Sequence, residues 1–90
     1  MSVRRSVLIT NQRGLHARAS AKFVTLAATQ PCELHVEKDG AGSVTGTSIM
    51  GLMMLGAAKG DTIVISAEGD QAEAAVGALC ALVEAKFGED

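Results

Sequence analysis

Hydrophobic and polar residues alternate along this chain in short segments, and the period of the alternation changes from one segment to the next. Between Val3 and Ile9 one face of an alternating pattern is more apolar than the other, which predicts a strand. Residues 11–14 break this pattern. Residues 17–30 predict a helix that Gln30-Pro31 ends. Its apolar face consists of Ala19, Phe23, Leu26 and Ala27.

The middle of the chain predicts a hairpin and a short helix. Residues 32–36 alternate and indicate a second strand. The glycine-rich segment 39–42 is a reversal signal, and residues 43–45 are short enough to be the return strand. Ser48 stands before the apolar residues 49–55 as a candidate helix N-cap, because its hydroxyl can accept from an unpaired amide of the first turn.

The last third of the chain predicts one strand and one helix. Residues 62–67 are rich in β-branched side chains and indicate a fourth strand. Asp70 with Glu73 three residues later forms a variant of the capping box, which opens the last helix. The order of elements is therefore βαββαβα. The apolar face of the last helix is predicted to hold Val76, Leu79, Cys80, Val83 and Phe87.

Length and charge exclude several classes of protein. The chain has 90 residues, with 8 Lys and Arg against 10 Asp and Glu, and a formal net charge of −2. This length suits one small two-layer domain over residues 1–90. Nucleic-acid binding needs clustered cations and, for single strands, aromatic stacking. The basic residues here are scattered and the only aromatics are Phe23 and Phe87, so we expect no nucleic-acid partner.

The sequence also predicts a cytoplasmic protein. Its longest strongly apolar stretch, residues 49–58, is only about half of a membrane span. The N-terminus carries charge but no apolar run followed by a small-residue cleavage site, so no secretory signal is visible. In a reducing compartment, Cys32 and Cys80 are most simply small buried hydrophobic residues.

The most pointed candidates for chemistry lie where the first strand gives way to the first helix, in residues 14–18. Gly14 can supply a positive φ that turns the side chain of His16 outward, so we expect this histidine to be exposed. Unpaired amides and the helix dipole favour an anion at this place, and Arg18 adds a guanidinium that suits phosphate oxygens. A neutral imidazole beside these amides and this guanidinium can accept and return a phosphoryl group.

A simpler interpretation exists for the same residues. His16 would then only cap the helix, and Arg18 would be a solvated side chain of the first turn. The spacing of one histidine and one arginine does not decide between the two interpretations.

The complete string of residues favours the chemical interpretation. Over residues 3–87 the sequence resembles the histidine-containing phosphocarrier protein (HPr) family of the bacterial phosphotransferase system. The segments that carry the resemblance are Gly14-Leu15-His16-Ala17-Arg18, Lys22-Phe23, residues 48–56 and Lys59-Gly60-Asp61.

The resemblance implies a fold, a function and a site. The fold is an α+β open-faced sandwich, a four-stranded antiparallel sheet covered on one side by three helices. His16 would accept the phosphoryl group at Nδ1, and Ala17, Arg18 and Ala19 would hold the phosphate. The donor would be enzyme I, charged by phosphoenolpyruvate, and the recipient a type IIA protein. The chain would thus be a stoichiometric carrier without a cofactor. The sequence leaves the oligomeric state open, and a monomer is the default for a carrier that presents one site to successive partners.

The sequence departs from the family at one place. The family usually has Pro-Ala after the arginine, whereas this chain has Ala19-Ser20, which restores an amide donor and adds a hydroxyl. We expect transfer to survive, with a less rigid loop. Together with residues 11–13, this pair resembles the nitrogen-related branch of the family, which serves regulation more than sugar import.

Ser48 has two interpretations that do not exclude each other. It is a helix cap by its position, and it matches the family position that a dedicated kinase phosphorylates in some bacteria. The host could thus supply a serine kinase or phosphorylase as a further partner.

Other functions fit the sequence less well. Cys32 and His35 lie three apart on the predicted strand, so their side chains point to opposite faces and cannot bind one metal. No Ser- or Cys-centred motif accompanies His16, which disfavours a hydrolase. The alternative from another class is a regulatory docking module that is never phosphorylated.

The helix after Ser48 is too apolar for a surface helix with one buried stripe. At 100° per residue, Leu52 and Leu55 fall on one arc, and Met50, Met53 and Met54 on the opposite arc, with Ile49 at the boundary. Neighbouring segments could cover both arcs. Exposed thioethers instead suit a surface that fits several partners. The hypothesis is that Ile49, Met50 and Met53 form a docking patch near His16.

Overall fold

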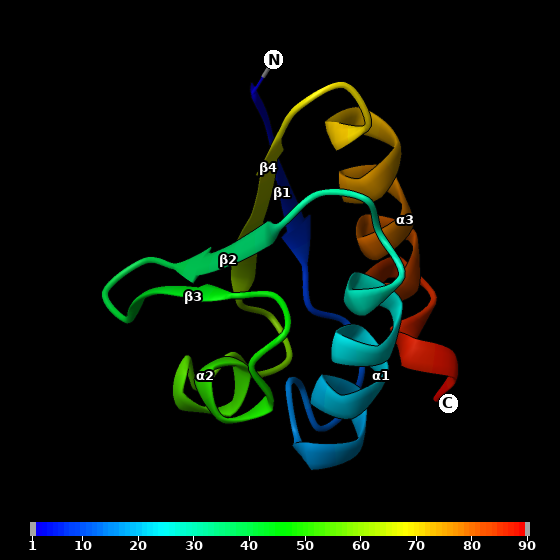
Figure 1. The fold of residues 1–90 in the computed structure, drawn as a ribbon. Helices are drawn as coiled ribbons and strands as arrows, with labels where there is room; N and C mark the ends of the chain where they lie inside the picture. Colours follow the sequence, from blue (N-terminus) through cyan, green and yellow to red (C-terminus); the bar gives the residue numbers. More distant parts are fainter. Residues whose placement is uncertain (1, 90) are drawn as a thin grey trace.

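The computed structural model describes residues 2–89, so Met1 and Asp90, the two ends of the predicted unit, lie outside it. The predicted order βαββαβα is confirmed (Figure 1), with one short 3₁₀ turn added after the last helix. The elements are β1 (Ser2–Leu8), α1 (Ala17–Ala28), β2 (Leu34–Lys38), β3 (Gly42–Thr45), α2 (Ile49–Met54), β4 (Thr62–Glu68), α3 (Ala72–Glu84) and the turn η1 (Lys86–Gly88).

The four strands form one antiparallel sheet in the order β1-β4-β2-β3. The strand β4 is thus the central partner of both β1 and β2. In the register, Val7 lies opposite Ile63, and Val36 lies opposite Ile65. These four side chains are buried. The period of 2 read from the sequence therefore places one face of β2 and of β4 in the core, whereas β1 contributes the buried Val7.

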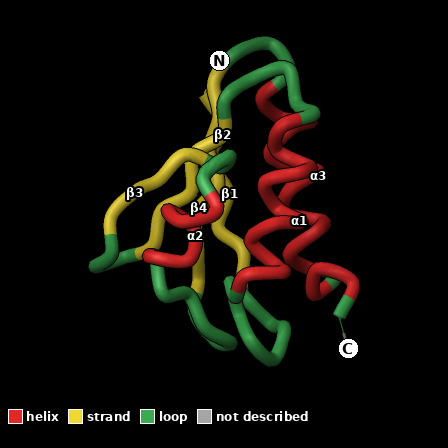
Figure 2. Tube along the Cα trace, turned by 60° about the horizontal axis from the view of Figure 1, so that its bottom comes forward, coloured by secondary structure: helices red, strands yellow, loops and turns green. Residues whose placement is uncertain are grey.

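The helices cover one face of the sheet, with α1 and α3 side by side against it (Figures 1 and 2). The helix α3 contacts β1 and β4, whereas α2 contacts β3 and the helix α1. Phe23 of α1 and Leu79 of α3 are completely buried in the shared core. The α+β open-faced sandwich is confirmed. Within residues 2–89, none of the helices has the length and apolar character that crossing a membrane requires.

The two cysteines have different environments. Cys80 is buried in α3, as predicted. Burial, the largest influence, and the nearby Glu84 raise the pKa of the Cys80 thiol against the opposing charge of Arg5, so this thiol stays protonated near neutral pH. The prediction for Cys32 was wrong, because the chain leaves α1 early and Cys32 lies in the loop before β2, where it is only half-buried.

The predicted start of the last helix was also wrong. The helix α3 begins at Ala72 with Gln71 as its N-cap residue, and no side chain forms a cap hydrogen bond. The reason is a turn in which the amide of Ala72 donates to the carbonyl of Gly69 at 3.2 Å. Because of this turn, α3 begins two residues after Asp70, and Gln71 takes the N-cap position that was predicted for Asp70. Asp70 and Glu73 therefore do not form the capping box.

Phe87 is buried, but it does not continue the helical face predicted for it. The helix α3 ends at Glu84, and Lys86 and Phe87 take positive φ angles of 58° and 56°. This left-handed turn folds the last residues back toward α1, and the Phe87 ring enters the core from there. Lys22 of α1 donates from Nζ to the carbonyl of Phe87 at 2.7 Å, which ties the turn to the helix.

Candidate functional site

The loop between β1 and α1 is held by the loop that precedes β4. The amide of Ile9 donates to the carbonyl of Asp61 at 2.8 Å, and the amide of Leu15 donates to that of Ala57 at 2.9 Å. Gly14 lies between them with φ of 63°, and an added Cβ there would lie 2.3 Å from the carbonyl oxygen of Ala57. Only glycine fits this position, which fixes how the chain enters α1.

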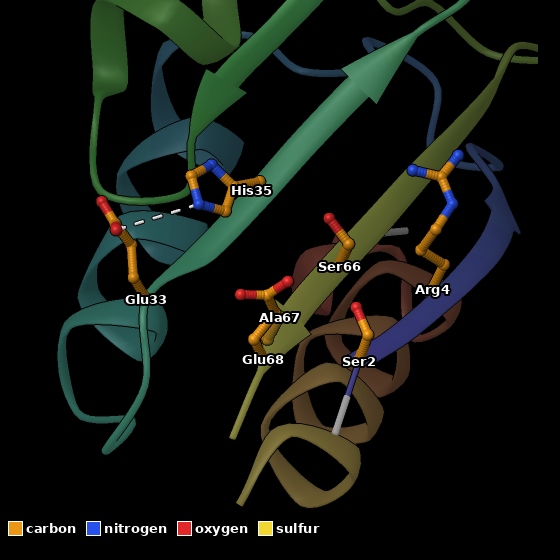
Figure 3. Close-up of a pocket in the computed structure, with 7 residues that line it drawn as sticks. All are labelled: Ser2, Arg4, Glu33, His35, Ser66, Ala67 and Glu68. Atoms are coloured by element: carbon orange, nitrogen blue, oxygen red, sulfur yellow. Dashed lines mark ion pairs between the residues drawn. The ribbon is translucent and has the colours of Figure 1, made fainter.

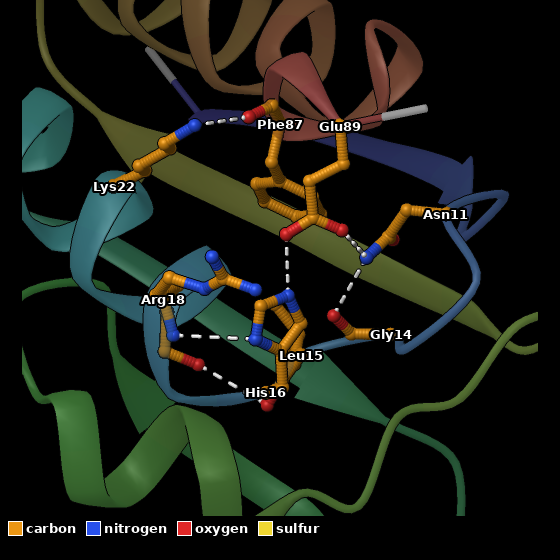
Figure 4. A network of polar contacts seen from close by, with 9 residues as sticks. Asn11, Gly14, Leu15, His16, Arg18, Lys22, Phe87 and Glu89 are labelled. Atoms are coloured by element: carbon orange, nitrogen blue, oxygen red, sulfur yellow. Dashed lines mark hydrogen bonds and ion pairs between the residues drawn. The ribbon is translucent and has the colours of Figure 1, made fainter.

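His16 is the N-cap residue of α1. Its backbone is extended, and its Nδ1 accepts a hydrogen bond from the amide of Arg18 at 3.3 Å. The expectation of an exposed histidine was wrong, because only 18 % of the side chain is accessible. The carboxylate of Glu89 covers the other ring nitrogen, Nε2, and makes an ion-pair contact with it (Figure 4). The ring edge that bears Nδ1 faces the first turn of α1.

Glu89 and Asn11 complete the polar network around the histidine (Figure 4). Asn11 is completely buried, and its Nδ2 donates both to the carbonyl of Gly14 at 2.9 Å and to Oε1 of Glu89 at 3.1 Å. Sequence reasoning missed Glu89, because 73 residues separate it from His16 and no local pattern signals the contact. The contact exists only because the left-handed turn brings the end of the chain back to α1.

The charge state of Glu89 follows from its neighbours. Partial burial by itself would raise the pKa of the Glu89 carboxyl. The hydrogen bonds from Asn11 and His16, with the charges of His16 and Arg18, outweigh this effect and lower the pKa below its ordinary value. Glu89 is therefore ionised at neutral pH.

The residues proposed to hold a phosphate lie in the first turn of α1. Ala17 and Arg18 are exposed, whereas Ala19 is buried. The amides of a first helical turn have no acceptors within the helix, and the helix dipole makes this end positive. The structure thus places these amides, the Arg18 guanidinium and Nδ1 of His16 at one helix end. That arrangement suits an anion at neutral pH.

Ser20 belongs to the pair that departs from the family's usual Pro-Ala. Its hydrogen bonds help to hold the loop before α1. Its side chain is completely buried, and its hydroxyl donates to the carbonyl of Leu15 at 3.2 Å. Its amide donates to the carbonyl of His16 at 2.9 Å. The extra hydroxyl is therefore used within the loop.

Ser48 caps α2, as predicted. Its Oγ accepts from the amide of Gly51 at 2.9 Å, and its side chain is half-buried. The helix α2 contacts α1, and its ribbon lies beside the first turn that carries Arg18 (Figure 4).

The two arcs of α2 differ as the sequence predicted. Leu52 and Leu55 are buried in the core, so the alternative in which both arcs are covered was wrong. The outward arc is exposed, with accessible fractions of 40 % for Ile49, 70 % for Met50, 42 % for Met53 and 78 % for Met54. An apolar patch thus lies on the surface beside the helix that carries His16.

The opposite face of the sheet holds a hollow that is lined by polar side chains (Figure 3). His35 lies 3.8 Å from a carboxylate oxygen of Glu33, and Arg4 forms an ion pair with Glu37 at 2.7 Å. In the described part of the chain, no three His, Cys, Asp or Glu side chains gather into a group that could hold a metal ion. The hollow therefore gathers mostly polar side chains on the face of the sheet opposite the helices.

Comparison with known proteins agrees with the fold and shows the family. The family model described as "PTS HPr component phosphorylation site" matches residues 3–85. The chain is similar to phosphocarrier protein HPr of Pseudomonas aeruginosa, with 43 % identity over 83 residues that cover 92 % of each chain. It is also similar to phosphocarrier protein NPr of Shewanella violacea, with 42 % identity over 94 % of this chain and 92 % of the relative.

A solved structure of an HPr protein is similar to this chain in both fold and sequence. The crystal structure of HPr-C-His from Thermoanaerobacter tengcongensis superposes with a TM-score of 0.90 and 44 % identity, and it covers 98 % of each chain. The fold and these relatives define a small phosphocarrier of the phosphotransferase system. The chain belongs to the HPr family, which includes the nitrogen-related NPr proteins.

Proposed function

We propose that His16 accepts a phosphoryl group at Nδ1 from phosphorylated enzyme I and passes it to a type IIA protein. The observation that carries this proposal is the placement of Nδ1 at the N-terminus of α1, where it accepts only a long hydrogen bond of 3.3 Å from the amide of Arg18. The lone pair of Nδ1 is therefore weakly engaged and lies at the positive end of a helix.

The phosphate, once attached, is held by the first turn. The amides of Ala17, Arg18 and Ala19 and the guanidinium of Arg18 supply donors to its oxygens. The amide of Arg18 leaves Nδ1 as the bond to phosphorus forms and then donates to a phosphate oxygen. Donors held at the end of the helix stabilise the charge that arrives there, which lowers the barrier in both directions of transfer. The chain acts as a stoichiometric carrier rather than an enzyme.

Both partners dock on the exposed side of α2, through the patch formed by Ile49, Met50 and Met53. The three side chains are exposed and lie on an element that contacts α1. Methionine side chains are flexible and polarizable, so one patch can fit a donor and a recipient of different shape. A carrier with one site and one patch meets its partners in turn, which is consistent with a monomer.

Ser48 is a regulatory site in this proposal. Its half-buried Oγ is occupied by the amide of Gly51, so a serine kinase would have to open the cap to reach it. A phosphate there would place negative charge directly beside Ile49 and so weaken docking of an apolar partner surface on this patch.

The proposal extends to the whole unit, residues 1–90, in the cytoplasm. It covers both branches of the family, since relatives of similar identity are named HPr and NPr. Sugar uptake and nitrogen-related regulation differ in the recipient, not in the chemistry at His16. The second candidate, a docking module that is never phosphorylated, uses the same patch without the histidine.

One experiment separates the two candidates. The native chain is incubated with enzyme I and phosphoenolpyruvate, and intact mass and peptide mass locate the added group. We expect one phosphoryl group on the peptide that contains His16, labile in acid as phosphohistidine is and absent when enzyme I is omitted. A chain that stays unmodified while it still binds enzyme I would support the docking module instead.

A further inference from the structure

The end of the chain is shaped to reach His16. After α3, the residues Lys86, Phe87 and Gly88 all have positive φ, a conformation that non-glycine residues rarely adopt. The Phe87 ring is completely buried, and the carbonyl of Phe87 accepts from Lys22 at 2.7 Å. Two contacts with other parts of the fold therefore hold a turn that is unfavourable by itself.

The turn delivers one functional group, the carboxylate of Glu89, to the histidine (Figure 4). One of its oxygens accepts from Nδ2 of Asn11 at 3.1 Å, and the other contacts Nε2 of His16. The same Asn11 amide also binds the carbonyl of Gly14. The loop before His16 and the carboxylate beside it are thus fixed by one buried side chain.

This contact selects one form of the neutral imidazole ring. A carboxylate only accepts hydrogen bonds, so the ring nitrogen that faces it carries the proton. With the proton on Nε2, the lone pair of the ring is on Nδ1, and the amide of Arg18 donates to that same atom. Both contacts of the ring therefore favour the form in which Nδ1 is the nucleophile.

We infer that Glu89 is a positioning residue for phosphoryl transfer, which holds the His16 proton on Nε2 and stabilises the charge that the ring gains. The inference rests on the proposed function. In the step, the lone pair of Nδ1 forms a bond to phosphorus, and the bond between phosphorus and the donor atom breaks with its electron pair going to the donor. The proton stays on Nε2, so the phosphorylated ring is a cation beside the Glu89 carboxylate.

The charges around the carboxylate fit this role. Asn11 and His16 donate hydrogen bonds to Glu89, and the guanidinium of Arg18 adds a positive charge near it. They keep the carboxylate ionised, with its pKa below the ordinary value. The arrangement resembles the carboxylates that orient metal-binding and catalytic histidines through the ring nitrogen that does not react.

The test compares Glu89→Ala with Glu84→Ala, which removes an exposed carboxylate from α3. The ¹⁵N shifts of the His16 ring in the unphosphorylated protein report the position of the proton. We expect the native chain and Glu84→Ala to show the proton on Nε2, and Glu89→Ala to show a mixture of both forms. Single-turnover transfer from enzyme I should slow by about tenfold in Glu89→Ala only, in the range found for residues that orient a histidine.

A third variant tests the charge separately from the fold. Glu89→Asp keeps the carboxylate on a shorter side chain, and we expect it to recover part of the lost rate. Unchanged ring shifts and rate in Glu89→Ala would overturn the inference but leave the proposed function intact. A native chain that takes no phosphoryl group would overturn the proposed function, and with it the role of Glu89 in transfer.

Discussion

The helices α1 and α2 begin in the same way but differ in what the capping side chain has left to offer. In each, an extended residue accepts from an amide of the first turn, at 3.3 Å for Nδ1 of His16 and at 2.9 Å for Oγ of Ser48. The serine bond is shorter and is typical of an N-cap that stabilises its helix. The imidazole bond is long and leaves the nitrogen available. The N-cap position can thus stabilise a helix, or it can hold a nucleophile at the positive end of that helix.

The surroundings of the two helix starts also differ, because one is polar and the other is apolar. The start of α1 lies among polar partners, with Glu89 on the histidine and Arg18 beside it. The start of α2 lies beside exposed apolar side chains, of which Met50 is accessible at 70 %. The proposed function therefore places chemistry and docking at two neighbouring helix ends, and variants should separate them.

The largest effect is expected from His16→Ala. It removes the nucleophile, so no phosphoryl group should be accepted, as read by intact mass with enzyme I and phosphoenolpyruvate. The lost cap is weak, so we expect the free energy of unfolding to fall by less than about 1 kcal/mol. His35→Ala is the matched control, because His35 is exposed on the opposite face of the sheet. Acceptance by the His16→Ala variant would contradict the site.

The next largest effect is expected at the apolar patch. Met50→Glu or Met53→Glu places a charge in the proposed interface, and transfer with both partners should slow by roughly 30-fold, as for loss of an interface hot spot of about 2 kcal/mol. Both side chains are already exposed, so the melting temperature should barely change. Met54→Glu is the control, because Met54 is exposed on the same helix but lies outside the proposed patch. Equal effects of all three variants would show that the docking patch is not limited to the proposed residues.

A smaller effect is expected from Arg18→Ala. The nucleophile remains, but the phosphate loses a cationic partner, so transfer should slow by about tenfold, below the full effect of a buried catalytic donor. Arg13→Ala removes an exposed cation from the preceding loop and should leave the rate unchanged. Single-turnover kinetics measure both variants. Equal rates for Arg18→Ala and the native chain would remove Arg18 from the mechanism.

Two substitutions of Ser48 should separate its effect on stability from its effect on transfer. Ser48→Ala loses the cap of α2 and should lower the free energy of unfolding by about 1 kcal/mol, while His16 still accepts phosphate. Ser48→Asp keeps a capping oxygen and adds charge, so acceptance should weaken at a near-native melting temperature. Ser43→Ala, at an exposed position of β3, is the control for losing a hydroxyl. Native transfer by Ser48→Asp would contradict the regulatory proposal.

The smallest effect is a dependence of stability on pH that Glu89 causes. The pKa of its carboxyl is lower in the folded chain than in the unfolded chain, where it is about 4.3. Its contribution to stability is therefore complete above that value and disappears as pH falls through the lower, folded pKa. Urea unfolding at several pH values should show a stability difference between the native chain and Glu89→Gln that shrinks in acid. A constant difference would contradict the contact.

The sequence predicted those features that depend on local patterns. The order of elements, the inward Leu52 and Leu55, and the cap at Ser48 all follow from neighbours within a turn or two along the chain. The capping box at Asp70 failed because the turn at Gly69 changed where α3 begins. The contact of Glu89 with His16 had no local signal, since it depends on a left-handed turn and a lysine far away in sequence. Long-range polar contacts need the fold before they can be seen.

The hydrogen bonds from Ile9 to Asp61 and from Leu15 to Ala57 have a consequence for recognition. They tie both ends of the loop that precedes His16 to the segment that leads into β4, the central partner of the sheet. The order of this loop is therefore established when the chain folds, and it does not have to be established again at each encounter. Under the proposed function, we expect this loop to keep one conformation at each encounter, so that adjustment of shape falls to the methionine side chains and to the partner.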